Sequence, residues 1–257
     1  LNTSLEIQEV PIPAIGPNQI LIKSHAASFN PLDFKTVRGD FKAIRKIQFP
    51  IGIGRDVSGV IEKVGEKVKK FKVGDKVYSR IDENFVGTMA EYVISNAADV
   101  ALMPSNLNFR EAASIPLAGL TVYQSLIDIA KLSSGNNILI HAGSGGVGTI
   151  AIQLSKYLGA NVTTTTSTKN ISMLKELGAD NVIDYTKQSY LEIGDKFDVV
   201  FDTLGGHYTL ESFKVLKAGG RVVSIAGDLD STTTKQLGLN KIIRCVLALK
   251  AKKITKA

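Results

Sequence analysis

The chain has 257 residues, of which 44% are hydrophobic and 21% charged, with a net charge of +7 and a single cysteine, Cys245. This composition is globular and the length favours two domains. One cysteine excludes an intrachain disulfide and a zinc module built on several thiolates. The basic residues are spread along the chain without a nucleic-acid-binding motif, so we expect no nucleic-acid partner. No apolar run reaches the roughly 18 residues of a membrane span and no signal peptide opens the chain, so we expect no membrane association and a cytoplasmic location.

Residues 1–106 are interrupted by Pro and Gly and carry short runs of β-forming residues. Short strands separated by turn residues favour a small barrel or sandwich. No long helical period is present in this half. We expect strands at 20–24, 57–64, 73–78 and 90–94.

Residues 107–257 alternate between strand and helix patterns. Apolar residues recur at helical spacing from Val147 to Leu158, and Gly159 follows where a helix commonly ends. Repeated strand–helix–strand units indicate a parallel, doubly wound sheet. We expect strands at 137–141, 162–166, 182–185, 198–202 and 221–225, and further helices at 171–177 and 210–216.

A glycine-rich segment joins the expected strand 137–141 to the helix after it. Residues 143–148 read G-x-G-x-x-G, and this position between a strand and a helix favours a dinucleotide site. Glycines let the backbone approach a pyrophosphate, and the helix N-terminus offers N–H groups and a positive dipole end. The alternative is a glycine-rich turn that binds nothing. The predicted cofactor-binding residues here are Ser144, Gly145, Gly146, Val147 and Gly148.

The end of the strand 162–166 indicates which dinucleotide would bind. A site for NAD places an acidic residue there to bind the ribose 2′-hydroxyl. This chain has no carboxylate at that point and continues with Ser167, Thr168 and Lys169. A hydroxyl and an ammonium group suit the 2′-phosphate of NADPH, so we predict that Ser167 and Lys169 bind NADPH. Lys169 could instead be a solvated lysine at a helix start.

Three further strand ends are expected at the same carboxyl edge of the sheet, where ligands bind in such folds. Tyr185 ends the strand 182–185, and Leu204 and Gly205 follow the strand 198–202. Ala226 follows the last strand. We predict that these four residues complete the cofactor site, with Leu204, Gly205 and Ala226 on the nicotinamide side. For Tyr185, a half-buried packing role is the alternative.

The motifs together resemble the medium-chain dehydrogenase/reductase superfamily, and most closely its zinc-free quinone oxidoreductase branch related to zeta-crystallin. The similarity extends over nearly the whole chain. Each motif alone is only modestly specific for this family, whereas the combination is highly specific. Besides the glycine loop, the matching segments are Phe29–Asp33, Gly54–Val60, Val64–Gly65, Gly74–Val77, Gly87–Tyr92, Ala112–Pro116 and Leu120–Tyr123.

The resemblance implies an α/β protein with a GroES-like β-barrel domain at 1–106 and a Rossmann domain at 107–257, with the active site between them. It also implies a homodimer formed through edge strands of the cofactor domains. Members of the family usually begin with an earlier strand and continue past the Rossmann domain to return to the first domain. We therefore expect the barrel's N-terminal strand and the C-terminal return to lie outside these 257 residues.

The zinc ligands of metal-dependent relatives are absent. At the positions where those relatives place Cys, His and Cys, this chain has Asn30, Arg55 and Leu117. We therefore expect no metal. Zinc stabilises a developing alkoxide, so an enzyme without it needs an acceptor that is already electrophilic, such as a quinone or an α,β-unsaturated carbonyl.

Asn30 and Thr121 are the polar residues predicted to orient the reactants. Asn30 could instead serve the turn before Pro31, and Thr121 could bind local backbone. Related 2-enoyl thioester reductases place a proton-donating Tyr where this chain has Phe41, which argues against that reaction. The open alternatives are an NADPH-binding sensor or structural protein without turnover, that thioester reductase, and an alcohol dehydrogenase.

Overall fold

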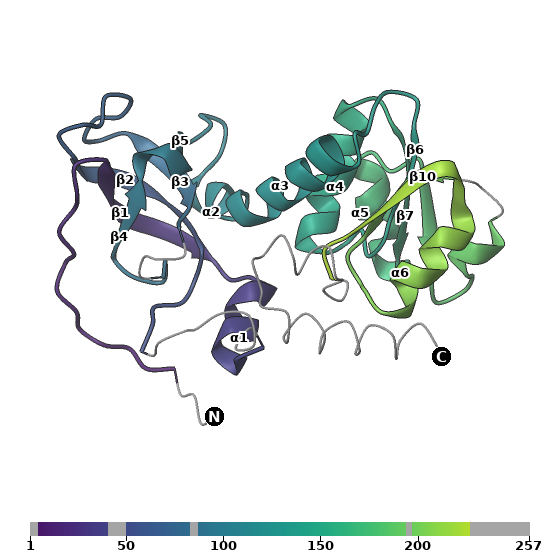
Figure 1. Ribbon diagram of the computed structural model, residues 1–257, viewed down its shortest axis with the longest axis horizontal. Helices are drawn as coiled ribbons and strands as arrows, with labels where there is room; N and C mark the ends of the chain where they lie inside the picture. Colours follow the sequence, from purple (N-terminus) through teal and green to yellow (C-terminus); the bar gives the residue numbers. More distant parts are fainter. Residues whose placement is uncertain (1–4, 41–49, 83–86, 194–196, 227–257) are drawn as a thin grey trace, which may run out of the picture. The chain divides into compact units, whose positions relative to one another are not determined.

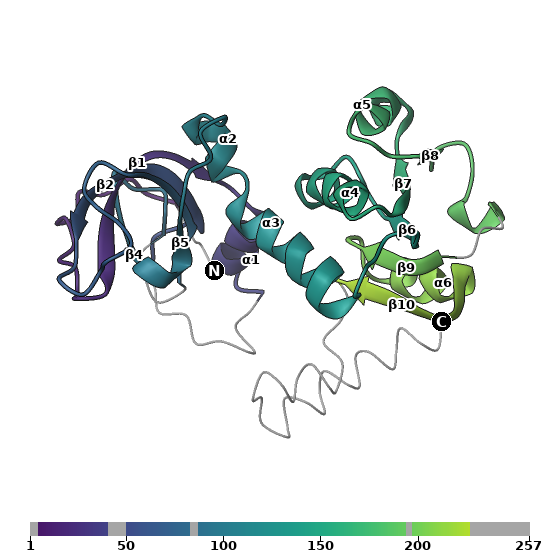
Figure 2. The ribbon, with the colours of Figure 1, turned by 90° about the horizontal axis from the view of Figure 1, so that it is seen from above.

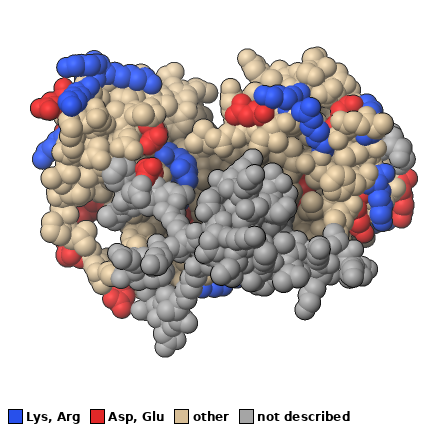
Figure 3. All heavy atoms as spheres, in the orientation of Figure 1, with Lys and Arg blue, Asp and Glu red and all other residues tan. Residues whose placement is uncertain are grey.

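The computed structural model describes residues 5–40, 50–82, 87–193 and 197–226. Phe41 and Cys245 lie outside these ranges. The chain divides into two compact units, Leu1–Leu117 and Ala118–Ala257, which are coloured purple to blue and teal to yellow in Figure 1. On the face drawn in Figure 3, Lys and Arg side chains lie next to Asp and Glu side chains on both units.

The first unit is built on one antiparallel sheet with the strand order β4-β1-β2-β3-β5. Its core is formed by alternate strand residues such as Ile20, Ile22, Val57 and Val77, all fully buried. The expected GroES-like β-barrel domain is thus present as an antiparallel half-barrel. The strands are β1 (Gln19–Ser28), β2 (Asp56–Val64), β3 (Lys76–Arg80), β4 (Tyr92–Asn96) and β5 (Val100–Leu102).

Two short helices accompany this sheet, α1 (Pro31–Arg38) and α2 (Phe109–Ala113). Helix α1 was not predicted, because its buried residues are the polar Asp33 and Thr36 and no apolar period marks it in the sequence. Helix α2 packs against β1 and β2, and Ser58 Oγ donates to the Phe109 carbonyl at 2.6 Å. The sequence-based boundary at 106/107 lies before α2, whereas the packing divides the chain after Leu117.

The second unit contains a parallel sheet with the strand order β10-β9-β6-β7-β8 (Figure 2). This confirms the predicted doubly wound Rossmann arrangement. The strands are β6 (Asn137–Ile140), β7 (Asn161–Thr166), β8 (Asn181–Asp184), β9 (Phe197–Asp202) and β10 (Leu216–Ser224). The helices are α3 (Pro116–Tyr123), which continues as a π-helical stretch over Gln124–Ile129, α4 (Gly146–Tyr157), α5 (Ile171–Glu176) and α6 (His207–Ser212).

Both faces of the parallel sheet carry buried apolar side chains and are covered. Ile138 and Ile140 pack under α3, α4 and α5, and Leu139 between them packs on the opposite face with residues near α6. The helix expected over 210–216 is shorter than predicted. It ends at Ser212 and tightens into a 3₁₀ turn over Phe213–Val215, because Leu216 is already paired with Phe197 as the first residue of β10.

Candidate functional site

The glycine loop leaves β6 and opens α4, as predicted. Gly143 and Gly148 are buried. A Cβ at Gly148 would lie 2.6 Å from the Ala142 carbonyl oxygen and 2.7 Å from the Cα of Gly143. Around Gly146 the space is open: apart from its chain neighbours and the backbone of its own helix, no heavy atom lies within 4 Å of a Cβ placed there. The outer glycines therefore let the loop pack tightly, while the exposed Gly145 and Gly146 leave room for a ligand above the helix N-terminus.

Threonines of β7 hold this loop in place. Thr165 Oγ1 accepts from the Ala142 N–H at 3.0 Å, and the Thr165 carbonyl accepts from the Gly143 N–H at 2.9 Å. Thr166 Oγ1 donates to Ser144 Oγ at 3.1 Å. Although the sequence analysis predicted a strand over the threonine run, it did not predict this role, because nothing in the sequence indicates which loop the buried hydroxyls contact.

The residues predicted to bind the 2′-phosphate gather at the ends of β7 and β8. Ser167 directly follows β7, and Lys169 is exposed in the 3₁₀ turn Thr168–Asn170. The Tyr185 N–H donates to the Thr166 carbonyl at 3.0 Å, which holds Tyr185 beside the end of β7. Its side chain is 64% exposed. Ser167, Lys169 and Tyr185 thus share one accessible corner of the carboxyl edge.

The carboxylate nearest in the chain to this corner is already engaged. Asp184, the last residue of β8, accepts from Thr168 Oγ1, and from Thr186 Oγ1 at 2.7 Å and its N–H at 3.0 Å. These bonds, that from Thr168 above all, lower the pKa of Asp184 to about 2. The Asp184 carboxylate is thus bonded to its own turn and also to Thr168, which lies between Ser167 and Lys169. Lys169 is exposed and Ser167 is half-buried.

Acid titration tests the Thr168–Asp184 bond. The folded-state pKa of Asp184 is depressed, so its contribution to stability is present above the ordinary value of 3.8 and is lost as the pH falls toward 2. We expect Thr168→Ala to be less stable than the parent protein at about pH 5, and the difference to disappear near pH 2. Urea unfolding at the two pH values measures this, and an equal difference at both would contradict it.

The loops after β9 and β10 meet at the other side of the carboxyl edge. Gly205 has a left-handed φ of 76°, and a Cβ there would overlap the carbonyl of Ala226. Leu204 is 44% exposed beside it. Thr203 Oγ1 donates to the His141 carbonyl at 2.8 Å and so ties this side to the end of β6. Leu204, Gly205 and Ala226 therefore form one patch, at the edge of the sheet where the sequence predicted them because each follows a strand.

In the first unit, Asn30 caps α1 and contacts a buried carboxylate. Its backbone N–H donates to Asp33 Oδ2 at 2.7 Å, and its Nδ2 donates to Asp56 Oδ2 at 2.9 Å and to Ser28 Oγ at 3.1 Å. Asp56 is fully buried and also accepts from Ser28 Oγ and from the Leu117 N–H at 2.9 Å. Burial, opposed by these bonds, raises the pKa of Asp56. Asp56 was not predicted to be the partner of Asn30.

The side chains at the expected zinc positions do not fit that metal. Zinc prefers thiolate, imidazole and carboxylate ligands. Asn30 directs its amide nitrogen to Asp56, Arg55 is cationic, and Leu117 has an aliphatic side chain. Among the described residues, no three His, Cys, Asp or Glu side chains are grouped closely enough to hold a metal ion.

Thr121 lies on α3 in the second unit and is half-buried.

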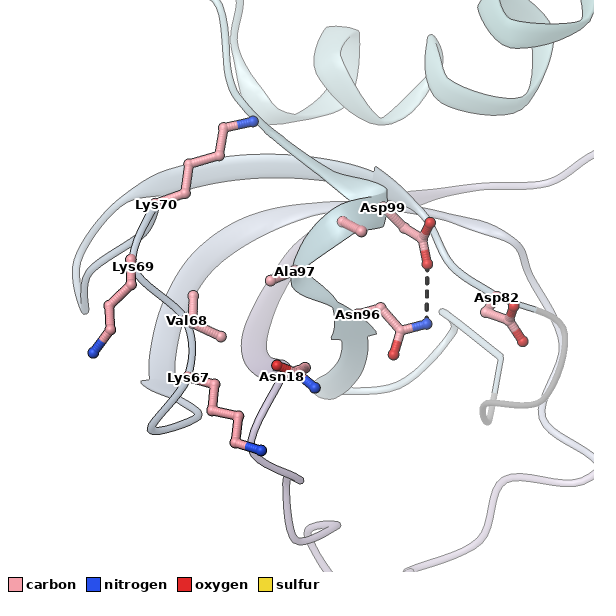
Figure 4. A pocket seen from close by; sticks show the side chains of 10 residues that line it. Asn18, Lys67, Val68, Lys69, Lys70, Asp82, Asn96, Ala97 and Asp99 are labelled. Atoms are coloured by element: carbon pink, nitrogen blue, oxygen red, sulfur yellow. Dashed lines mark hydrogen bonds between the residues drawn. The ribbon is translucent and has the colours of Figure 1, made fainter.

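A hollow of about 590 Å³ on the first unit contains none of the predicted site residues (Figure 4). Lysines and carboxylates both line it, and Asn96 Nδ2 donates to Asp99 Oδ2 at 3.1 Å there. In the described part of the chain, no helix is long and apolar enough to cross a membrane.

Comparison with known proteins identifies related sequences for both units. Residues 16–105 match the alcohol dehydrogenase GroES-like domain family, and residues 146–254 match the zinc-binding dehydrogenase family. The chain is 45% identical over 226 residues to a 2-methylene-furan-3-one reductase of Solanum lycopersicum. It is 41% identical over 224 residues to a chloroplastic NADPH-dependent alkenal/one oxidoreductase of Arabidopsis thaliana.

These alignments take in 85% and 84% of this chain, which spans 57% of the length of each relative. The structure of a quinone oxidoreductase from Coxiella burnetii superposes with a TM-score of 0.78 at 36% identity, over 93% of this chain and 74% of that one. The homodimer and the cytoplasmic location stay predictions. The chain belongs to the medium-chain dehydrogenase/reductase superfamily, in its quinone oxidoreductase and alkenal/one oxidoreductase branch.

Proposed function

We propose that the protein is an NADPH-dependent oxidoreductase that transfers hydride to a quinone or to an α,β-unsaturated carbonyl compound. The observation that carries the cofactor assignment is the open space at Gly146 above the helix N-terminus, together with the accessible Ser167 and Lys169 at the end of β7. Family membership and the names of the relatives support the reaction type.

Each part of the cofactor has a counterpart at the carboxyl edge. The amides of the loop from Ser144 to Gly148 would bind the pyrophosphate. Ser167, Lys169 and Tyr185 would hold the adenosine 2′-phosphate end. Leu204, Gly205 and Ala226, on the other side of β6, would contact the nicotinamide. NADPH supplies the hydride when bound. The residues of this chain would bind the cofactor, orient the acceptor and exclude water from the site.

The side chains at the positions where metal-dependent relatives hold zinc limit the class of acceptor. Asn30, Arg55 and Leu117 provide no Lewis acid site, so we propose an acceptor whose own conjugation spreads the negative charge that hydride transfer creates. Asn30 and Thr121 would orient the reactants. A proton from water would complete the reduction, so that the products are NADP⁺ and the hydroquinone or the saturated carbonyl compound.

Charge reversal at Lys169 tests the cofactor assignment. We expect Lys169→Glu to weaken NADPH binding about tenfold or more and to leave NADH binding nearly unchanged, because only NADPH carries the 2′-phosphate. Lys175→Glu, an exposed lysine on α5, makes the same change in net charge and serves as the control. Fluorescence titration of the reduced nicotinamide measures both affinities. Equal losses for the two dinucleotides would refute the role of Lys169.

Consumption of NADPH in the presence of quinones and enones tests the reaction itself. We expect turnover with acceptors of these two classes and none with simple alcohols and NADP⁺. Binding of NADPH without consumption by any acceptor would overturn the enzymatic proposal and favour a protein that binds the dinucleotide as a sensor.

A further inference from the structure

The carboxylate of Asp202, the last residue of β9, is fully buried and accepts four hydrogen bonds. Oδ1 accepts from the N–H groups of Leu204 at 2.9 Å and Gly205 at 3.0 Å. Oδ2 accepts from Ser224 Oγ at 2.8 Å and from Thr209 Oγ1. Burial raises the pKa of Asp202, but these bonds outweigh it and leave the pKa below its ordinary value.

These bonds fix two loops at once. Leu204 and Gly205 belong to the turn after β9, whereas Ser224 ends β10. The Asp202 carbonyl also accepts from the Ile225 N–H at 3.0 Å. Because Gly205 packs directly against Ala226, a shift of either loop moves the other. One buried residue therefore sets the shape of the whole patch formed by Leu204, Gly205 and Ala226.

The strand order separates this patch from the rest of the predicted site. In the order β10-β9-β6-β7-β8, the glycine loop follows the central strand β6. Ser167, Lys169 and Tyr185 follow β7 and β8 on one side of it, and the Asp202 network follows β9 and β10 on the other. A dinucleotide whose pyrophosphate lies over the central strand extends its two halves in opposite directions along this edge.

We propose that Asp202 is a positioning residue for the nicotinamide half of the cofactor and has no part in binding the adenosine half. This inference rests on the proposed NADPH site. The charged carboxylate holds the backbone of Leu204 and Gly205 and the end of β10 in the arrangement against which the nicotinamide packs. Asp202 itself is enclosed by its four donors and does not touch the cofactor.

Two ligands separate the halves of the site experimentally. NADPH uses the whole edge, and adenosine 2′,5′-bisphosphate uses the adenosine side and the glycine loop only. For Asp202→Ala we expect at least a tenfold loss of NADPH affinity and less than about a twofold change for the bisphosphate. Asp202→Asn keeps an oxygen for the Leu204 and Gly205 N–H groups, so its loss of NADPH affinity should be smaller.

The control is Asp198→Asn, which alters the carboxylate at the opposite end of the same strand. Asp198 accepts from the Asn137 N–H and from Lys217 Nζ, both at 2.8 Å. This variant should bind both ligands as the parent protein does. The emission of bound NADPH gives an additional readout, since a displaced nicotinamide changes its fluorescence while the bisphosphate affinity stays constant.

The outcomes distinguish this inference from the proposed function. If the parent protein binds neither ligand, the NADPH site is wrong. If the parent binds both and folded Asp202→Asn and Asp202→Ala bind NADPH unchanged, the positioning role is wrong and the NADPH site stands. Equal loss of both ligands in a folded variant would also overturn the inference. If Asp202→Ala fails to fold, the same comparison is made with Asp202→Asn and Ser224→Ala, where the inference requires a larger loss of affinity for NADPH than for the bisphosphate.

Discussion

Replacement of Gly146 by leucine is expected to lower the affinity for NADPH at least a hundredfold, about 2.7 kcal/mol, while the fold is retained. Gly146 is exposed, and apart from its chain neighbours and the backbone of its own helix no heavy atom lies within 4 Å of the position that a Cβ would take there, so we expect the new side chain to be accommodated without disturbing the packing. It projects instead into the space that the pyrophosphate needs. Fluorescence titration measures the affinity, and circular dichroism with urea unfolding verifies the fold.

Gly148 provides the matched control two residues along the same helix. A Cβ there would lie 2.6 Å from the Ala142 carbonyl oxygen, so even Gly148→Ala forces the loop and helix apart. We expect this variant to lose about 1–3 kcal/mol of unfolding free energy. If Gly146→Leu binds NADPH normally, the loop is not the pyrophosphate site. If it unfolds instead, the space around Gly146 does not accommodate a side chain.

Removal of the Asp56 carboxylate should produce the largest change in stability. In Asp56→Ala, the amide of Asn30, the hydroxyl of Ser28 and the N–H of Leu117 all lose their common acceptor. Donors left unsatisfied in a buried setting cost about 1–3 kcal/mol each, partly relieved by rearrangement and water. We expect the free energy of unfolding to fall by about 3 kcal/mol or more, as measured by urea denaturation.

The control for this variant is Asp75→Ala in the same unit. Asp75 Oδ2 accepts from the Lys72 N–H at 3.0 Å in an exposed turn, so its loss should cost about 1 kcal/mol or less. If the two variants were equally stable, the buried network around Asp56 would not carry the stability assigned to it. In the proposed mechanism Asp56→Ala also frees the Asn30 amide to rotate, so turnover should fall even where the protein remains folded.

The parallel sheet and its glycine loop were predictable because their signals are local. Short runs of apolar or β-branched residues mark β6 and β7, and G-x-G-x-x-G marks the turn between β6 and α4. The strand order then follows from the fold type, and it places the ends of β7, β8, β9 and β10 along one edge. The residues predicted at those ends do lie there.

The features that escaped prediction depend on contacts between distant residues. Asp56 lies 26 residues from Asn30 and 61 from Leu117 in the sequence, and no pattern indicates that one carboxylate joins them. Asp202 likewise contacts Ser224, which lies 22 residues away in the sequence on the neighbouring strand β10. Helix α1 escaped for a different reason. It buries Asp33 and Thr36 instead of an apolar stripe, so hydrophobic periodicity could not reveal it.

The threonine contacts beneath the glycine loop have a consequence for the thermodynamics of binding. Thr165 and Thr166 hold Ala142, Gly143 and Ser144 against β7, so the loop has already given up its conformational freedom when the protein folds. A ligand that arrives there loses little further entropy by ordering the backbone. The hydroxyls of a buried strand thus preorganise the proposed phosphate site. The entropy cost of ordering the loop is met when the protein folds, and it does not reduce the affinity for the dinucleotide.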